Sequence, residues 1–106
     1  MTSIARVPER LVRFSDSFFD RLDALLPAER PGDGSPSATD FLLIDVPRLR
    51  DRLANDYRGS TLPTDDPDVR VIVAASMLFR AVALYVVEMP DGHIEVVWLS
   101  FERATP

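Results

Sequence analysis

The chain has 106 residues, of which 46% are hydrophobic and 27% are charged, and this predicts one globular domain spanning residues 1–106. It has no cysteine and a single histidine, His93, so disulfides, thiolate chemistry and a zinc site built from Cys and His are excluded, and we predict neither a metal nor a cofactor. The net charge is −5 although all twelve basic residues are arginine, and this acidic balance argues against a general nucleic-acid binder.

No stretch of the sequence is typical of a signal peptide or a membrane span. Residues 1–14 lack the apolar run of a signal peptide, and Arg70 and Arg80 interrupt the longest apolar candidate, residues 69–87. Because this candidate is rich in β-branched residues, it favours strands over a membrane helix. We therefore expect a cytoplasmic protein with no membrane contact.

The first elements in chain order are a short strand and a helix. Residues 10–15 alternate loosely between apolar and polar side chains and predict the strand, after which Ser15 or Asp16 offers a helix N-cap. Pro27 ends the helix, and residues 28–38, with two prolines, two glycines and two serines, predict a loop. The apolar stripe of this helix has helical spacing and consists of Phe18, Leu22, Leu25 and Leu26.

A second helical pattern follows, capped by Thr39 or Asp40. Pro47 interrupts it, so either the helix kinks there or a new helix begins with Pro47 in its first turn and Asp45 as cap, and we favour the break. Residues 58–68 predict another loop. The apolar stripe advances in steps of three or four residues and consists of Leu42, Val46, Leu49, Leu53 and Tyr57.

Arginines lie on the outer side of this second pattern. Arg48 and Arg52 are four residues apart and therefore share one helix face. The simplest interpretation is a solvated face, and the functional alternative is a surface for an acidic partner. We carry Arg48 and Arg52 forward as candidate partner-binding residues.

The last third of the chain predicts three strands, at residues 69–76, 78–89 and 93–103, all rich in β-branched and aromatic side chains. Between the last two strands, residues 90–92 read Pro-Asp-Gly and predict a tight turn. The predicted fold class is therefore α+β: an N-terminal strand, two helices, and a three-stranded antiparallel β-meander with the helices on one face.

Both faces of this predicted sheet are apolar, whereas a sheet with one face in water usually alternates apolar and polar residues. We therefore expect a second cover over the sheet, either a partner chain, a second copy, the N-terminal arm or the 28–38 loop. In the last strand Ile94, Val96 and Trp98 are expected on one face, and the candidate partner-binding residues Val97, Leu99 and Phe101 on the other.

Three stretches of sequence carry a resemblance to a known family. Residues 12–18 read VRFSDSF, residues 78–82 read LFRAV with Tyr85 after them, and residues 94–99 read IEVVWL. Together with the element order, over about residues 10–103, they resemble the RelE/ParE toxin superfamily of bacterial toxin–antitoxin systems. The resemblance implies a RelE/ParE-like fold and a cognate antitoxin as partner.

Two activities follow from this resemblance: mRNA cleavage on the ribosome by RelE-type toxins, and inhibition of DNA gyrase by ParE-type toxins. The resemblance places Arg80, Arg70 and Arg103 at the positions of nuclease residues, but the C-terminal end lacks the usual His or Tyr and the chain lacks lysine. We therefore expect a ParE-like toxin that binds a macromolecular target. The alternatives are a ribosome-dependent endoribonuclease and a catalytically silent module that dimerises through its sheet.

Overall fold

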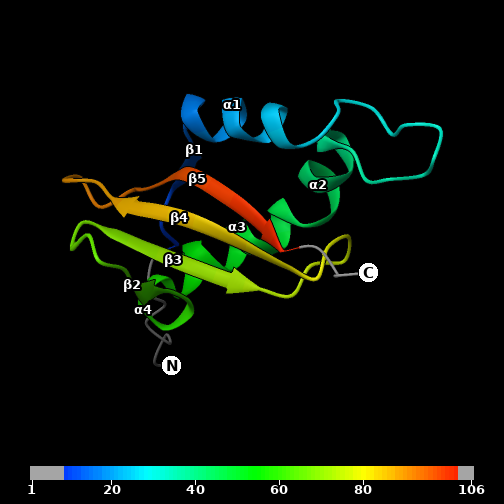
Figure 1. Cartoon of the computed structure of the whole chain (residues 1–106). Helices are drawn as coiled ribbons and strands as arrows, with labels where there is room; N and C mark the ends of the chain where they lie inside the picture. The colour runs from blue at the N-terminus through cyan, green and yellow to red at the C-terminus, as the bar shows by residue number, and fades with distance from the viewer. Residues whose placement is uncertain (1–8, 103–106) are drawn as a thin grey trace, which may run out of the picture.

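The computed structural model describes residues 9–102 and has an α+β architecture in which helices pack on a single mixed sheet (Figure 1). The predicted class is therefore confirmed. In chain order the elements of the described part are β1 (Val12–Phe14), α1 (Asp16–Leu25), α2 (Ala38–Ile44), α3 (Val46–Asn55), α4 (Tyr57–Ser60), β2 (Leu62–Pro63), β3 (Val69–Ala74), β4 (Ala81–Glu88) and β5 (Ile94–Glu102).

The sheet has five strands in the order β1-β5-β4-β3-β2, so it is larger than the predicted three-stranded meander: the predicted N-terminal strand joins it as β1, and β2 is an additional strand. The predicted antiparallel meander, β3-β4-β5, forms its centre. At one edge β1 runs parallel to β5, with Val12 opposite Ile94. At the other edge Leu62 of β2 lies opposite Val71. Since β2 has only two residues, one of them a proline, no alternation pattern in the 58–68 segment indicated it.

The 58–68 segment departs from the predicted loop in a second way, because the short helix α4 occupies its beginning. Asp56 caps this helix by accepting a hydrogen bond from the Gly59 amide at 3.1 Å. The predicted 28–38 loop is confirmed up to its last residue, Ala38, which begins α2. The tight turn after β4 is also confirmed, with Gly92 at a φ of 90° and the Met89 amide donating to the His93 carbonyl at 2.8 Å.

Polar caps set the ends of the first two helices. Ser15 accepts from the Phe18 amide at the start of α1, as predicted. For α2 the cap is Ser37 instead of the predicted Thr39 or Asp40, and Asp40 closes a capping box by accepting from the Ser37 amide. Serine followed three residues later by an acid is the pattern of this motif, and it fits better than a cap inside the helix.

The predicted helix break at Pro47 is confirmed, since α2 ends at Ile44 and α3 starts at Val46 with the proline in its first turn. Asp45 occupies the cap position, but its side chain makes no capping hydrogen bond. Its carboxylate is buried and reaches Ser76 and the backbone beyond β3 instead. The Asp45 side chain, which the sequence suggested as a helix cap, therefore joins the α2–α3 junction to the segment after β3.

The core lies between one face of the sheet and the helices. In Figure 1, α3 lies behind the sheet, while α1 runs beside β5 at the β1 edge. The largest fully buried side chains come from α1, α2, α3 and the three central strands: Phe18, Leu22, Phe41, Leu49, Leu53, Ile72, Val82, Leu84, Val86, Ile94, Val96 and Leu99.

Candidate interaction surface

A β-bulge in β5 decides which side chains face away from the helices. Val96 lies opposite Val86, but Trp98 lies opposite the neighbouring Tyr85, so Val97 is an extra residue in β5. Beyond the bulge the alternation of faces is therefore inverted. Leu99 turns into the core and is fully buried, whereas Trp98 turns outward and is 44% exposed.

The prediction that Val97, Leu99 and Phe101 share one face, opposite Ile94 and Val96, is therefore wrong for Leu99 and Phe101. Phe101 packs against the core, where its ring stacks on Phe79 with centroids 4.2 Å apart. Val97 directs its carbonyl to the sheet edge, where Ser17 binds it at 2.7 Å. The bulge causes the error, because one extra residue moves every later side chain of the strand to the opposite face.

The sheet face that points away from the helices carries a continuous apolar row across four strands. Leu62, Val71, Tyr85 and Trp98 lie opposite one another in register from β2 to β5. Val73 follows on β3 and is 53% exposed, and Leu62 is 60% exposed. We call this surface the open face and define it by Leu62, Val71, Val73, Ala83, Tyr85 and Trp98.

Helix α1 closes the β5 edge of the open face. The amide of Ser15 donates to the Val96 carbonyl at 3.0 Å, and Nε of Arg21 donates to the Leu99 carbonyl at 3.2 Å. The Arg21 guanidinium also lies over the Trp98 ring, 4.6 Å from its centroid, in cation–π geometry. The part of the β5 edge that β1 does not pair, after Val96, is therefore covered by side chains of α1. Arg21 also holds Trp98 in place at the border of the open face.

A small charged cluster borders the other end of β5. Nε2 of His93 lies 3.0 Å from Glu95, and the second ring nitrogen contacts Asp91 in the preceding turn. Both hydrogen bonds raise the pKa of His93 above its ordinary value, and the bond to Glu95 has the larger effect. The backbone amide of His93, which donates to the Asp91 carboxylate at 3.0 Å, and after it the ring contact lower the pKa of Asp91.

The candidate nuclease arginines do not come together. Arg70 is held by Thr61, with Nε 2.7 Å from its hydroxyl and Nη2 2.9 Å from its carbonyl. Arg70 lies opposite Val86, six positions after Arg80, so the two arginines are about 20 Å apart along the sheet at about 3.3 Å per residue. Arg80 is exposed, 4.0 Å from Glu102, and Arg103 lies outside the described residues.

The two arginines of α3 that share a face have different environments. Nη2 of Arg48 donates to Asp45 at 2.9 Å and to the Ala75 carbonyl at 2.8 Å, which ties α3 to the end of β3. Arg52 remains exposed on the same helix. Arg48 therefore has a structural role, and of the pair Arg52 is the one accessible to a partner.

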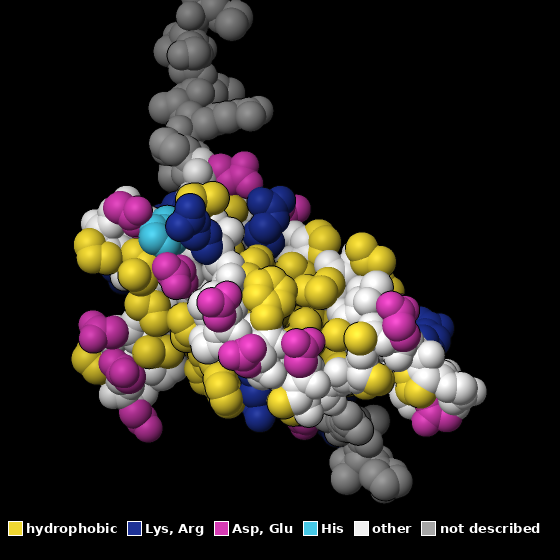
Figure 2. All heavy atoms as spheres, turned by 90° about the horizontal axis from the view of Figure 1, so that it is seen from above, with side chains coloured by type: hydrophobic (Ala, Val, Ile, Leu, Met, Phe, Trp, Pro, Cys, Tyr) yellow, Lys and Arg dark blue, Asp and Glu magenta, His cyan; other side chains and the backbone are white. Residues whose placement is uncertain are grey.

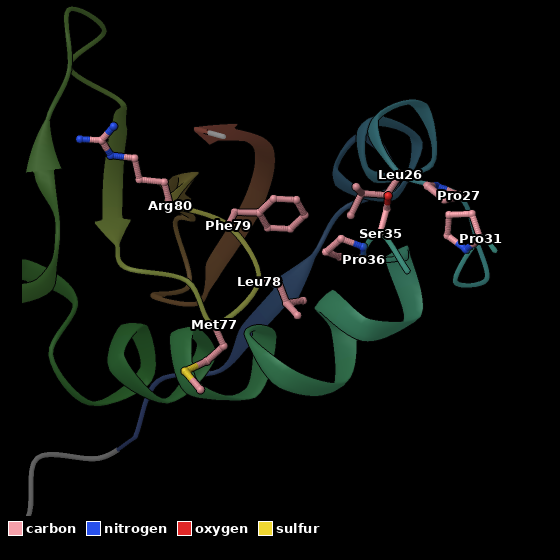
Figure 3. A pocket seen from close by; sticks show the side chains of 9 residues that line it. All are labelled: Leu26, Pro27, Pro31, Ser35, Pro36, Met77, Leu78, Phe79 and Arg80. Atoms are coloured by element: carbon pink, nitrogen blue, oxygen red, sulfur yellow. The ribbon is translucent and has the colours of Figure 1, made fainter. Parts of the chain in front are cut away.

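A separate apolar cavity of about 570 Å³ opens where the 28–38 loop approaches the segment between β3 and β4 (Figure 3). We call it the proline cleft. No pattern in the sequence indicated it, because its walls come from two loops about 45 positions apart in the chain. Its lining residues are Leu26, Pro27, Pro31, Ser35, Pro36, Met77, Leu78, Phe79 and Arg80.

No protein-family model, no curated protein and no solved structure matches this chain. Within residues 9–102, no helix is both long enough and apolar enough to cross a membrane. The same residues contain no group of three or more histidine, aspartate or glutamate side chains placed to hold a metal ion.

Proposed function

We propose that this protein is a RelE/ParE-like toxin of a bacterial toxin–antitoxin system, that it acts in the ParE manner by binding a macromolecular target such as DNA gyrase, and that a cognate antitoxin neutralises it. The open face is the observation that carries the proposal. It presents a row of large apolar side chains, from Leu62 to Trp98, on a sheet whose opposite face already packs against the helices.

The positions of the arginines support binding over RNA cleavage. A ribonuclease needs a base for the ribose hydroxyl, positive charge at the phosphate and an acid for the leaving oxygen, all within reach of one phosphodiester. Arg70 is occupied by Thr61 on the helix-covered side of the sheet, and Arg80 lies about 20 Å away at the other end. One phosphate cannot contact both residues.

The chemistry of the open face suits a protein segment. Tyrosine and tryptophan are enriched at the centres of protein interfaces, where they contribute large contact area at low cost in conformational entropy. Tyr85 lies within the row and Trp98 at its β5 border, where Arg21 offers a charge. A target or antitoxin segment with an apolar face and an acidic flank complements this arrangement.

The test is induced expression in a bacterial host of wild type, Val73→Asp and Leu43→Asp, with growth, mRNA integrity and the SOS response followed in the same cultures. Val73 lies on the open face, whereas Leu43 is an equally apolar, 72% exposed residue on α2. We expect wild type and Leu43→Asp to arrest growth and induce the SOS response with intact mRNA. We expect Val73→Asp to lose the arrest, because a charge in the row blocks apolar contact.

Circular dichroism of the purified variants checks that Val73→Asp remains folded. Two results would contradict the proposal. Loss of mRNA without an SOS response would indicate the endoribonuclease, and normal growth with wild type would indicate a catalytically silent interaction module.

A further inference from the structure

Both walls of the proline cleft are held in place by hydrogen bonds at their bases. The loop that forms the first wall is closed by the Ala38 amide on the Pro27 carbonyl at 2.7 Å and by the Thr39 hydroxyl on the Ala28 carbonyl at 2.8 Å. Prolines contribute further stiffness, because the ring fixes φ. This wall therefore needs little ordering when a ligand binds.

The second wall, residues 76–80, is anchored to the helices. The Ser76 hydroxyl donates to the buried Asp45 carboxylate, and in turn accepts from the amides of Leu78 and Phe79, both at 2.9 Å. The Met77 amide donates to the same carboxylate at 3.2 Å. Preorganisation of this kind favours ligand binding, because the entropy of ordering has already been lost on folding.

Phe79 provides an aromatic surface inside the cleft. One side of its ring stacks on Phe101, whose ring in turn meets the edge of Phe41 with centroids 5.0 Å apart. In Figure 3 the Phe79 side chain extends toward Leu26 and Pro36 across the cavity. A planar ring that enters the cleft can therefore lie between Phe79 and the proline wall.

Arg80 is the one charged residue among the residues that line the cleft. Its guanidinium extends away from the proline wall in Figure 3, and its side chain is 63% exposed with Glu102 4.0 Å away. Because both members of this ion pair are exposed and the separation is long, the pair contributes little and the guanidinium can turn to another anion. The cleft therefore has an apolar interior, and the Arg80 guanidinium reaches its mouth when the exposed side chain turns from Glu102 toward the proline wall.

We propose that the proline cleft is a binding site for a small aromatic anion, with its ring packed between Phe79 and Pro36 and its carboxylate or sulfonate bound by Arg80. The cavity of about 570 Å³ lies within the range of about 300–1,000 Å³ that is usual for small-molecule sites. This site is separate from the open face, so the proposal does not depend on the proposed function.

The test is titration of the ¹⁵N-labelled full chain with 2-naphthoate, followed by amide chemical shifts. We expect saturable shifts of the amides at residues 77–80 and of Ser35. The uncharged analogue 2-naphthamide should bind roughly tenfold more weakly, because it loses the charge-assisted hydrogen bond to Arg80. Arg80→Ala should weaken 2-naphthoate by the same factor and leave 2-naphthamide unchanged.

Arg58→Ala is the matched control, because Arg58 is an exposed arginine on α4 and does not line the cleft. It should bind 2-naphthoate like wild type. Phe79→Leu keeps an apolar side chain but removes the ring, and should weaken both probes. Shifts that concentrate on the open face, no saturable shifts, or equal affinity of the two probes for wild type would overturn the proposal.

Discussion

At the residue scale, Asp45 shows how one buried carboxylate organises several segments. Its side chain is fully buried and accepts hydrogen bonds from the Ser76 hydroxyl, the Met77 amide and Nη2 of Arg48. It therefore joins the α2–α3 junction to the segment between β3 and β4. A charge without access to water is stable only when such partners surround it.

We expect Asp45→Ala to lower the free energy of unfolding by about 1–3 kcal/mol, because the partly exposed donors of Arg48, Ser76 and Met77 lose their buried acceptor. Urea denaturation followed by circular dichroism measures this loss. The control is Asp51→Ala, since Asp51 forms an exposed ion pair with Arg50 and should change the free energy by less than about 1 kcal/mol. Equal effects of the two substitutions would contradict the assigned role of Asp45.

His93 makes stability depend on pH. Its pKa in the folded state is raised by Glu95 and Asp91, so the protonated form stabilises the fold. This stabilisation is fully present below the unfolded-state pKa of about 6.5 and is lost as the pH rises through the higher folded-state value. The lowered pKa of Asp91 also stabilises the folded state between about pH 4 and about pH 6.5. Its stabilisation is present above the ordinary Asp value and is lost only as the pH falls through the lower folded-state value.

We therefore expect His93→Gln to lower the melting temperature at about pH 5.5 and to have little effect at about pH 9, where the wild-type imidazole is uncharged in the folded and the unfolded state. Thermal unfolding of both proteins at the two pH values measures the difference. A loss of equal size at both values would mean that the ring contributes by packing and not by its charge.

At the element scale, local signals predicted the helices better than the sheet. Pro47 indicated a kink or a break in the second helical pattern, of which the break was favoured, and Ser15 was one of two candidates for the start of α1. The sequence did not determine which side chains of β5 face the core. Either alternation fits, because the four consecutive residues Val96, Val97, Trp98 and Leu99 are all apolar. The bulge at Val97 depends on the register with β4.

The candidate surface was unpredictable for the same reason. The exposure of Trp98 follows from the bulge, and the cover of the β5 edge depends on hydrogen bonds from Ser17 and Arg21 to carbonyls about 80 positions later. The retention of Arg70 by Thr61 also depends on the fold, since β2 brings that part of the chain beside β3. The sequence marks the arginines that could bind a partner, and the fold decides which of their side chains are already held by hydrogen bonds within the protein.

At the scale of the whole molecule, acidic and apolar side chains are interspersed on the face that carries α1 (Figure 2). Seen from the α1 side in Figure 2, acidic side chains gather around exposed apolar ones. Asp16, Asp20 and Asp23 are all exposed on α1. A negative potential on this side disfavours approach of nucleic acid there.

The size of the open face predicts that the protein alone is a monomer. The face spans four strands spaced about 4.8 Å apart, and about five residues along each strand at about 3.3 Å per residue. Its area is therefore roughly 300 Å² per copy. Two copies that meet through this face alone bury roughly 600 Å², well below the about 1,200 Å² of a stable interface, and a different chain reaches that area only by contacting surface beyond the open face as well. Trp98, the single tryptophan, lies on this face and reports on any contact made there.

We therefore expect sedimentation velocity to give a monomer, and the Trp98 emission maximum to stay constant, from roughly 1 μM to 100 μM. The Val73→Asp variant should behave identically, because in a monomer the open face contacts only water. A blue shift of Trp98 emission with rising concentration, absent in Val73→Asp, would assign the open face to self-association and favour the silent module that dimerises through its sheet. A constant spectrum leaves the open face for a different chain, as the proposed toxin function requires.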